Sequence, residues 1–272
     1  MVESDQYFLG YRQAEQERLQ RQAQELAHEA RWLLDQIGVR MGARVVEIGC
    51  GPQGCLDLLS ERVGPTGSVV GVERNEEAVN LARRFVADRN LANVQVLNGD
   101  ARASGLPRST FDLATARLVL VNVPKPEGVV AEMVALARPG GVVAVHEADG
   151  TSHVCDPPLP AFDRLFELFV TYARMNGMDP FIGRRVPRML WEAGLVDIRV
   201  NPLIHVYPPG HRRRSIFLDH VENLRDRLLE QNLIEERELT ELLKDLKRHL
   251  DDPQTLVVSY VFFQAWGRKS EQ

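Results

Sequence analysis

Cysteine is scarce in this 272-residue sequence, and the three cysteines present show no pairing pattern. Cys50, Cys55 and Cys155 are odd in number and form no C-x-x-C spacing. Disulfide frameworks and structural zinc sites need paired or regularly spaced cysteines, so both are disfavoured. The sequence therefore predicts reduced thiols and no metal site.

Long apolar runs and an excess of charge of one sign are also missing. No stretch approaches the roughly 20 apolar residues of a membrane span, and the start lacks the basic and apolar segments of a secretory signal. Lysine plus arginine (33) nearly balance aspartate plus glutamate (38), giving a net charge of −5. Such a chain has no global attraction to nucleic acid or anionic lipid. We therefore expect a cytoplasmic protein that binds neither nucleic acid nor membrane.

What the sequence does contain is the composition of an ordinary globular protein, with 44% hydrophobic residues. Its first segment has a helical pattern. From Leu19 to Ile37 apolar residues recur at the spacing of an amphipathic helix, and the pattern ends near Gly38. Residues 1–40 are therefore predicted to form an N-terminal helical cap.

From Ala43 onward, short β-branched runs alternate with helical stretches. The predicted strands are residues 44–48, 68–72, 94–97, 111–115, 141–145, 196–200 and 256–266. The predicted helices are residues 56–63, 76–88, 127–137, 161–175 and 184–193, and residues 155–158 are read as a turn. Strands that alternate with helices of this length build a doubly wound sheet. The predicted fold class is α/β, with a mainly parallel seven-stranded sheet.

An insertion over residues 211–252 separates the last two predicted strands. Its apolar residues recur at helical spacing, so two helices are expected, in a position to form a lid over a site. The cluster Arg212-Arg213-Arg214 precedes them, but the insertion holds more acids than bases. We interpret the cluster as a solvated helix start rather than an anion site. Residues 41–210 and 253–272 then form the main domain.

The strongest motif is a G-x-G-x-x-G between a strand and a helix, at Gly49, Gly51 and Gly54. These glycines allow a tight turn and let a ligand approach the helix N-terminus. Glu73 ends the next predicted strand, where a carboxylate can accept both hydroxyls of a ribose. A nicotinamide dinucleotide and another adenosine cofactor both fit this pattern. Glu47 favours the second, because its charge would crowd a pyrophosphate and suits a cationic ligand.

The order of the motifs resembles that of class I S-adenosylmethionine-dependent methyltransferases. The resemblance spans residues 43–147 and rests on Glu47, the glycines, Glu73, Asp100-Ala101 and Arg138-Pro139-Gly140-Gly141. It implies a Rossmann-like methyltransferase fold with S-adenosyl-L-methionine as cofactor. Phe111-Asp112, Asn122-Val123 and Glu132-Met133 resemble the small-molecule branch of the class, which includes quinone-biosynthesis and natural-product enzymes.

The resemblance also implies roles for individual residues. The loop from Glu47 to Gly54 holds the methionine part of the cofactor, Glu73 binds the ribose, and Arg74 lies against the adenine. Asp100 meets the adenine amino group, with the Ala101 backbone nearby. The expected cofactor-binding residues are Glu47, Gly49, Cys50, Gly51, Gly54, Glu73, Arg74, Asp100, Ala101 and, on the sulfonium and acceptor side, Arg117 and Leu118.

A polar cluster follows the fifth predicted strand, at the edge of the sheet where doubly wound folds bind ligands. It contains His146, Glu147 and His153. They are the candidate catalytic residues, because each can take a proton from the molecule that receives the methyl group. Side chains alternate along a strand, so His146 and Glu147 cannot both face the pocket. Glu147 and His153 are the expected pocket-facing pair.

The sequence therefore predicts an enzyme that transfers a methyl group to an oxygen, nitrogen or activated carbon of a small-molecule acceptor, aromatic or natural-product-like. The N-terminal cap and the insertion are expected to close over this acceptor, and a homodimer is compatible with the sequence. Two alternatives stay open. One is an NAD-dependent oxidoreductase that uses the same glycine loop, and the other is a cofactor-binding or cyclase protein that transfers no methyl group.

Overall fold

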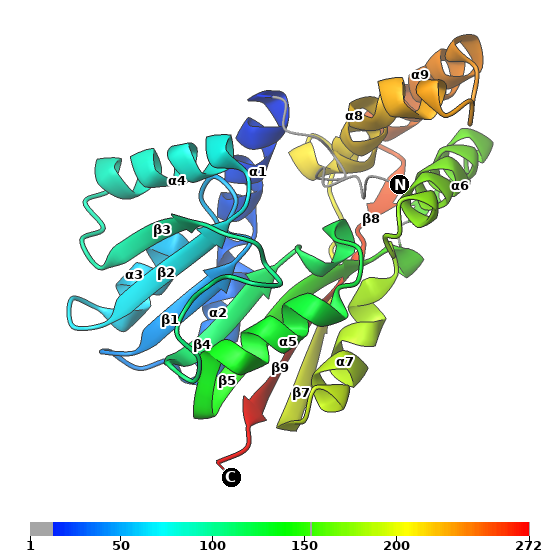
Figure 1. The fold of residues 1–272 in the computed structure, drawn as a ribbon. Helices are drawn as coiled ribbons and strands as arrows, with labels where there is room; N and C mark the ends of the chain where they lie inside the picture. Colours follow the sequence, from blue (N-terminus) through cyan, green and yellow to red (C-terminus); the bar gives the residue numbers. More distant parts are fainter. Residues whose placement is uncertain (1–12, 153, 272) are drawn as a thin grey trace.

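The computed structural model describes residues 13–152 and 154–271. In these residues a seven-stranded sheet forms the centre, with the strand order β3-β2-β1-β4-β5-β9-β7 (Figure 1). The strands of this sheet are β1 (Arg44–Ile48), β2 (Ser68–Glu73), β3 (Val94–Asn98), β4 (Phe111–Arg117), β5 (Ala137–Asp149), β7 (Leu195–Leu203) and β9 (Val261–Lys269).

The sheet is parallel from β3 to β5, whereas β9 runs antiparallel to both of its neighbours, β5 and β7. The chain moves from β1 through β2 to β3 on one side and resumes at β4 on the other side of β1. The predicted doubly wound, mainly parallel sheet is therefore confirmed. In such folds ligands bind beyond the carboxyl ends of the strands where the order reverses, which here are β1 and β4.

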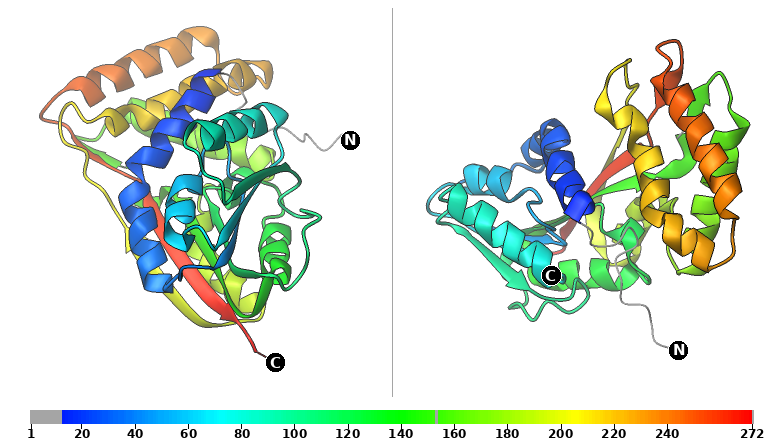
Figure 2. Two further views of the ribbon diagram at one scale, coloured as in Figure 1. Left: turned by 90° about the vertical axis from the view of Figure 1, so that its left-hand side faces the viewer. Right: turned by 90° about the horizontal axis from the view of Figure 1, so that it is seen from above.

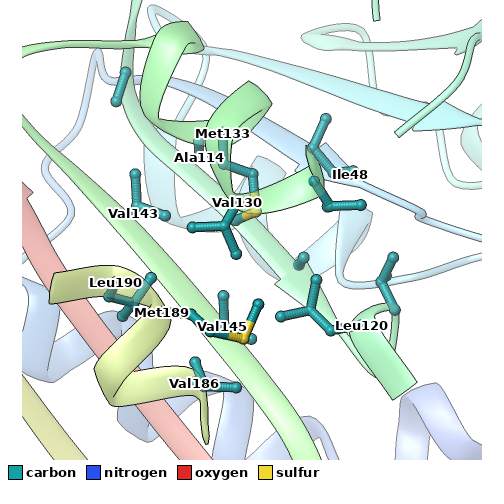
Figure 3. Packing of buried hydrophobic residues seen from close by; sticks show 14 of the residues in the cluster. Ile48, Ala114, Leu120, Val130, Met133, Val143, Val145, Val186, Met189 and Leu190 are labelled. Atoms are coloured by element: carbon teal, nitrogen blue, oxygen red, sulfur yellow. The ribbon is translucent and has the colours of Figure 1, made fainter. Parts of the chain in front are cut away.

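Helices cover both faces of the sheet because neighbouring strand residues point in opposite directions. Val45 and Leu113 pack under α2 (Ala27–Ile37), α3 (Leu56–Val63) and α4 (Glu76–Asp88). Val46 and Ala114 pack under α5 (Glu127–Leu136) and α7 (Val186–Glu192). Figure 3 shows the second cluster, with side chains of α5 and α7 beside the strand residues. The two cores hold the sheet rigid beneath the site.

A third hydrophobic core lies outside the sheet. Helices α6 (Pro160–Met175), α8 (Ile216–Glu230) and α9 (Glu236–Asp251) pack together around residues such as Leu165, Phe217 and Leu243, and we call these three helices the cap bundle. Figure 2 shows the bundle standing apart from the helices of the sheet. The two helices expected in the insertion are present as α8 and α9. Helix α6, which the sequence placed with the main domain, shares their core.

Two element predictions need correction. The N-terminal helix is two helices, α1 (Gln13–Glu25) and α2, that meet at Leu26. The long last strand is also divided, into β8 (Leu256–Val258) and β9. Ser259 interrupts it, because its N–H donates to the His205 carbonyl at 2.8 Å and its Oγ accepts from the His205 N–H at 2.9 Å.

The first half of the divided strand belongs to a second, two-stranded sheet. In it β8 pairs antiparallel with β6 (Val154–Asp156). The turn expected over residues 155–158 is therefore wrong for its first two residues, which are in a strand. Short 3₁₀ helices complete the described structure: η1 (Leu120–Asn122), η2 (Gly150–Ser152), η3 (Ile182–Arg185) and η4 (Arg212–Ser215).

The arginine cluster before α8 is not the solvated helix start that the sequence suggested. Arg213 and Arg214 are only 7% and 6% exposed. Arg214 donates to four carbonyl oxygens: Nε to Leu250 at 3.0 Å, Nη1 to Tyr207 at 2.9 Å, and Nη2 to Asp252 at 3.0 Å and Thr255 at 2.9 Å. A balance of charge in the insertion could not reveal this, because the partners are backbone atoms brought together by the fold.

Replacing Arg214 with methionine should destabilise the protein, because four carbonyls, three of them in buried hydrogen bonds, lose their donor. We expect the free energy of unfolding to fall by about 3 kcal/mol. Urea denaturation of the two proteins measures this difference. Arg212→Met is the matched control, since Arg212 is exposed and should change stability by less than about 0.5 kcal/mol. Equal effects of the two substitutions would contradict the role of Arg214.

Candidate active site

A cavity of about 510 Å³ opens at the carboxyl ends of β1 and β4. One half of its wall comes from the loops that follow β1, β2, β3 and β4. The other half comes from α1, α6, η4, α8 and the start of β9. The cavity thus lies where the sheet, the N-terminal segment and the cap bundle meet.

The glycine loop after β1 can exist only with glycine at two of its positions. Gly49 has φ +67°, and a Cβ there would lie 2.6 Å from Cγ2 of Val119. Gly54 has φ +57°, and a Cβ there would lie 2.5 Å from Oε2 of Glu47. Both the left-handed backbone and the close neighbours exclude larger residues. The loop therefore turns tightly over the side chain of Glu47.

Glu47 is the buried acid of the site. Its two carboxylate oxygens accept from the Cys55 N–H, at 3.0 and 2.9 Å. Burial raises the pKa of Glu47 to about 7, although the positive charge of Arg117 and the bond to Cys55 oppose this shift. Arg117 itself donates from Nη2 to the Gly54 carbonyl at 3.1 Å. Glu47 and Arg117 thus support the glycine loop from below.

Glu73, at the end of β2, is hydrogen-bonded to the glycine loop. Its Oε2 accepts from the Gly51 N–H at 3.0 Å, and its Oε1 accepts from the N–H groups of Arg74 at 2.9 Å and Asn75 at 2.8 Å. These bonds hold the carboxylate beside the glycine loop, at the end of the strand next to β1. The carboxylate retains lone pairs for further donors, such as ribose hydroxyls.

Asp100 follows β3 and is bound by a neighbour that the sequence did not single out. Arg102 donates to it from Nε at 3.1 Å, from Nη2 at 3.0 Å and from its backbone N–H at 2.7 Å. The hydrogen bond from the Arg102 side chain is the main reason that the pKa of Asp100 is lowered. Asp100 is therefore a fixed, ionised acceptor at the rim of the cavity.

The end of β4 turns sharply into the cavity wall. Leu118 has φ +55°, a left-handed conformation that is uncommon for a residue other than glycine, and its N–H donates to the His146 carbonyl at 2.8 Å. This turn brings Arg117 and Leu118 to the cavity, as the sequence led us to expect.

The structure brings all eleven expected cofactor-binding residues to this one cavity. They are Glu47, Gly49, Cys50, Gly51, Gly54, Glu73, Arg74, Asp100, Ala101, Arg117 and Leu118. Their individual contacts with a cofactor stay predictions. The residues come from the ends of four neighbouring strands, which explains how positions 47 to 118 can surround one ligand.

The candidate bases are placed differently. Glu147 was expected to face the pocket, but its side chain is fully buried, accepts from the N–H groups of Leu120 at 2.7 Å and Ala148 at 3.1 Å, and is not part of the cavity wall. Burial raises its pKa to about 7. The expectation that Glu147 faces an acceptor is therefore corrected: its carboxylate holds η1 in place instead.

His146 is buried on the other side of the strand. Its ring lies edge-on to Phe262, with the centroids 5.6 Å apart, and neither ring nitrogen has a hydrogen-bond partner in the described part of the chain. Burial lowers its pKa to about 3, so the ring is neutral at ordinary pH. It also lies outside the cavity wall. His153 lies outside the described residues.

The acceptor-side wall contains residues that sequence reasoning missed. They are mainly Arg18 and Gln22 of α1, Phe169 and Met175 of α6, Arg213, Ile216 and His220 before and in α8, and Tyr260 and Phe262. The spacing of Arg213, Ile216 and His220 puts them on one face of a helix. This spacing is the sequence pattern from which their common position could have been predicted. The N-terminal segment and the insertion both reach the cavity, together with α6.

No group of three or more histidine, cysteine, aspartate or glutamate side chains in residues 13–152 and 154–271 is arranged to hold a metal ion. Over the same residues, no helix combines the length and the apolar character needed to span a membrane.

Comparison with known proteins defines the class. A family model described as a methyltransferase domain matches residues 40–177, which contain the whole glycine loop and the ends of β1 to β5. The chain belongs to this methyltransferase family. Within it, the chain is a class I S-adenosylmethionine-dependent methyltransferase, as the order of its motifs predicts. This decides against the NAD-dependent oxidoreductase alternative.

Two curated relatives illustrate the range of the family. An uncharacterised 37.1 kDa protein in a transposon of Streptomyces fradiae is 33% identical over 176 residues, which cover 64% of this chain and 50% of the relative. The chain thus spans half the length of that relative. A demethylmenaquinone methyltransferase of Geobacillus is 30% identical over 195 residues, covering 66% of this chain and 83% of the relative.

A solved structure agrees in fold. Phosphoethanolamine N-methyltransferase 2 of Haemonchus contortus, in complex with phosphomonomethylethanolamine and S-adenosylhomocysteine, superposes with a TM-score of 0.56 and 17% sequence identity. The match covers 88% of this chain and 52% of that one. At this identity the likeness concerns the fold alone.

Substitution of Glu47 by glutamine should change how stability depends on pH. The folded protein binds the Glu47 proton more tightly than the unfolded chain does, since the pKa is about 7 against an ordinary 4.5. The stabilising effect is therefore complete below about pH 4.5 and is lost as pH rises through 7. At pH 8, Glu47→Gln should be more stable than the wild type by about 3 kcal/mol.

Denaturation at pH 5 and pH 8 measures this change. The difference between variant and wild type should be small at pH 5 and grow towards pH 8. Glu61→Gln, at an exposed position on α3, serves as the control and should show no such growth. A difference for Glu47→Gln that is the same at both pH values would be inconsistent with a buried, protonated Glu47.

Proposed function

We propose that this protein transfers a methyl group from S-adenosylmethionine to a small-molecule acceptor. The observation that carries the proposal is the shared cavity: its sheet half is lined by the eleven residues expected to bind the cofactor, and its other half by mainly apolar residues of the cap bundle and mainly polar residues of α1. Cofactor and acceptor would then meet in one cavity.

The sheet half suits an adenosine cofactor with a cationic end. Glu73 presents a fixed carboxylate beside the loop that runs from Gly49 to Gly54. Glu47 adds an acid beneath that loop, and a nearby cation would favour its ionised form. Asp100, already ionised, lines the cavity after β3, the strand next to β2. This donor and acceptor set fits ribose hydroxyls, an adenine amino group and a positive charge.

When bound between the glycine loop, Glu73 and Asp100, the cofactor would supply an electrophilic methyl group to a lone pair of the acceptor, and the electrons of the carbon–sulfur bond would stay on sulfur. The protein contributes position. Phe169, Ile216 and Phe262 give the acceptor side an apolar surface, which an acceptor would cover on binding. Holding the two reactants in line removes much of the entropic barrier of a bimolecular step.

Positioning does not depend on the two candidate bases that the structure describes. Neither His146 nor Glu147 reaches the cavity, so neither is placed to take a proton from an acceptor. Effective molarities in well-oriented reactions reach roughly 10⁵ M or more, which is enough for an acceptor that is already a good nucleophile. An acceptor that is aromatic or natural-product-like, as the small-molecule branch suggests, fits the apolar wall.

Glu73→Gln should weaken binding of S-adenosylhomocysteine, because the amide lacks the charge that strengthens bonds to ribose hydroxyls. We expect a loss of about 10- to 150-fold in affinity, corresponding to about 1.5 to 3 kcal/mol. Calorimetric titration measures it. Glu76→Gln, an exposed acid in the first turn of α4, is the matched control and should bind normally. Unchanged affinity in Glu73→Gln would remove this residue from the site.

Turnover separates methyl transfer from the alternative of a cofactor-binding or cyclase protein. The wild type is incubated with S-adenosylmethionine labelled in its methyl group and a panel of phenols, acids and amines. Label in a product supports the proposal, whereas binding of S-adenosylhomocysteine without label transfer to any acceptor supports the alternative. S-adenosylhomocysteine at 100 times its Kd should add about 2.7 kcal/mol of stability, and NAD should add none.

A further inference from the structure

We propose that the methyl acceptor is an organic acid with an apolar skeleton, and that Arg213 binds its anionic group. The proposal rests on the methyltransferase function proposed above. It assigns a substrate class and a specificity residue to the acceptor half of the cavity.

The acids of the cavity wall lie in one half of it, whereas arginines line both halves. All the acids that line it, Glu47, Glu73 and Asp100, belong to the sheet half. The half formed by α1, the cap bundle and β9 contains Arg18 and Arg213, and no acid among its described lining residues. Both arginines are paired with acids behind the wall, Glu15 and Glu25, so the wall itself offers an acceptor guanidinium donors and no carboxylate. An anion can accept from such donors, whereas an ammonium group finds no acid there. The division therefore favours an acidic acceptor.

Arg213 is a charged group held in a fixed position at this wall. The residue is only 7% exposed, and its guanidinium lies over the rings of Tyr207 and Phe262, at 5.9 and 5.8 Å from their centroids. Its Nε donates to the Tyr207 hydroxyl at 3.0 Å and its Nη1 to Glu25 at 3.0 Å. A buried guanidinium with fixed neighbours is preorganised to bind an oxyanion.

One nitrogen of Arg213 remains for a ligand. Within the described residues, no hydrogen bond involves Nη2, and this atom is not among the buried nitrogens that lack a partner. Nη2 is thus accessible in a residue that lines the cavity. Arg18 differs, because Glu15 accepts from both its Nε and its Nη2 at 2.7 Å. Of the two arginines in the acceptor half, Arg213 is therefore the one with a donor to offer.

The apolar side chains beside Arg213 favour an acceptor with an apolar skeleton. Phe169, Met175, Ile216 and Phe262 present apolar surface on the same side as Arg213. Such a wall gains little from a small, fully hydrated acid, whereas an aromatic or alicyclic acid buries its skeleton against it. The combination of one accessible guanidinium and an apolar wall matches an apolar acid.

Binding of matched probes to the protein saturated with S-adenosylhomocysteine tests this proposal. The probes are 2-naphthoate and 2-naphthamide, which have the same skeleton and differ in charge, followed by the corresponding benzoic, biphenyl and anthracene pairs. We expect the acid to bind about 10- to 100-fold more tightly than its amide in the best-fitting pair. Calorimetry on the wild type gives this ratio without any substitution.

Three variants separate recognition from support of the fold. Arg213→Met should bring the acid-to-amide ratio close to 1. Glu25→Gln breaks the same ion pair but keeps the guanidinium, so it should retain the preference for the acid. Arg212→Met, in the adjacent exposed residue, should leave the ratio unchanged. If Glu25→Gln loses the preference for the acid as Arg213→Met does, the ion pair between Arg213 and Glu25 acts only in supporting the fold. This outcome would contradict the proposal that Arg213 binds the anion.

The outcomes distinguish this inference from the proposed function. If S-adenosylhomocysteine does not bind the wild type, the proposed function fails. If it binds normally while no acid is preferred over its amide in any pair, the inference is overturned and the methyltransferase proposal stands. A preference for the acid that persists in Arg213→Met also overturns it, since another group must then bind the anion.

Discussion

The geometry of the site depends on one buried carboxylate. Glu47 occupies the space inside the glycine loop, bonds to the N–H of Cys55 and lies close enough to Gly54 that no side chain is tolerated there. Arg117 and Glu73 then fix the loop from the adjacent strands, through the Gly54 carbonyl and the Gly51 N–H. Three strands are thereby tied to a single turn. The cost is a carboxyl group whose pKa burial raises to about 7, and a cationic ligand would favour its ionised form.

The parts of this structure that local pattern determines could be predicted from the sequence. The alternation of Val45 and Val46 between two cores, and the helical spacing in α3, α4, α8 and α9, are properties of short segments. The cofactor half of the site could also be predicted, since its residues stand at strand ends and strand order brings those ends together. The break at Ser259 could not, because it depends on pairing with His205, a residue far away in the sequence.

The acceptor half was beyond the reach of sequence patterns for the same reason. Arg213 and Arg214 look alike in the sequence, yet one lines the cavity and the other is surrounded by backbone carbonyls. Glu147 stands at a strand end, as a catalytic acid would, but the N–H groups of η1 turn its carboxylate away from the cavity. Position along a strand predicts which face a side chain takes. It does not predict which nearby backbone atoms compete for that side chain.

The separation of the hydrophobic cores has a consequence for how such a protein can diversify. The core of the cap bundle shares no residue with the two cores that flank the sheet. Energetic effects of substitutions at distant sites without common partners are nearly additive, so changes inside the cap bundle leave the stability of the glycine loop almost untouched. Proteins with this fold can therefore change the acceptor half of the cavity one substitution at a time. The residues of the glycine loop, which serve the methyl donor, can stay the same.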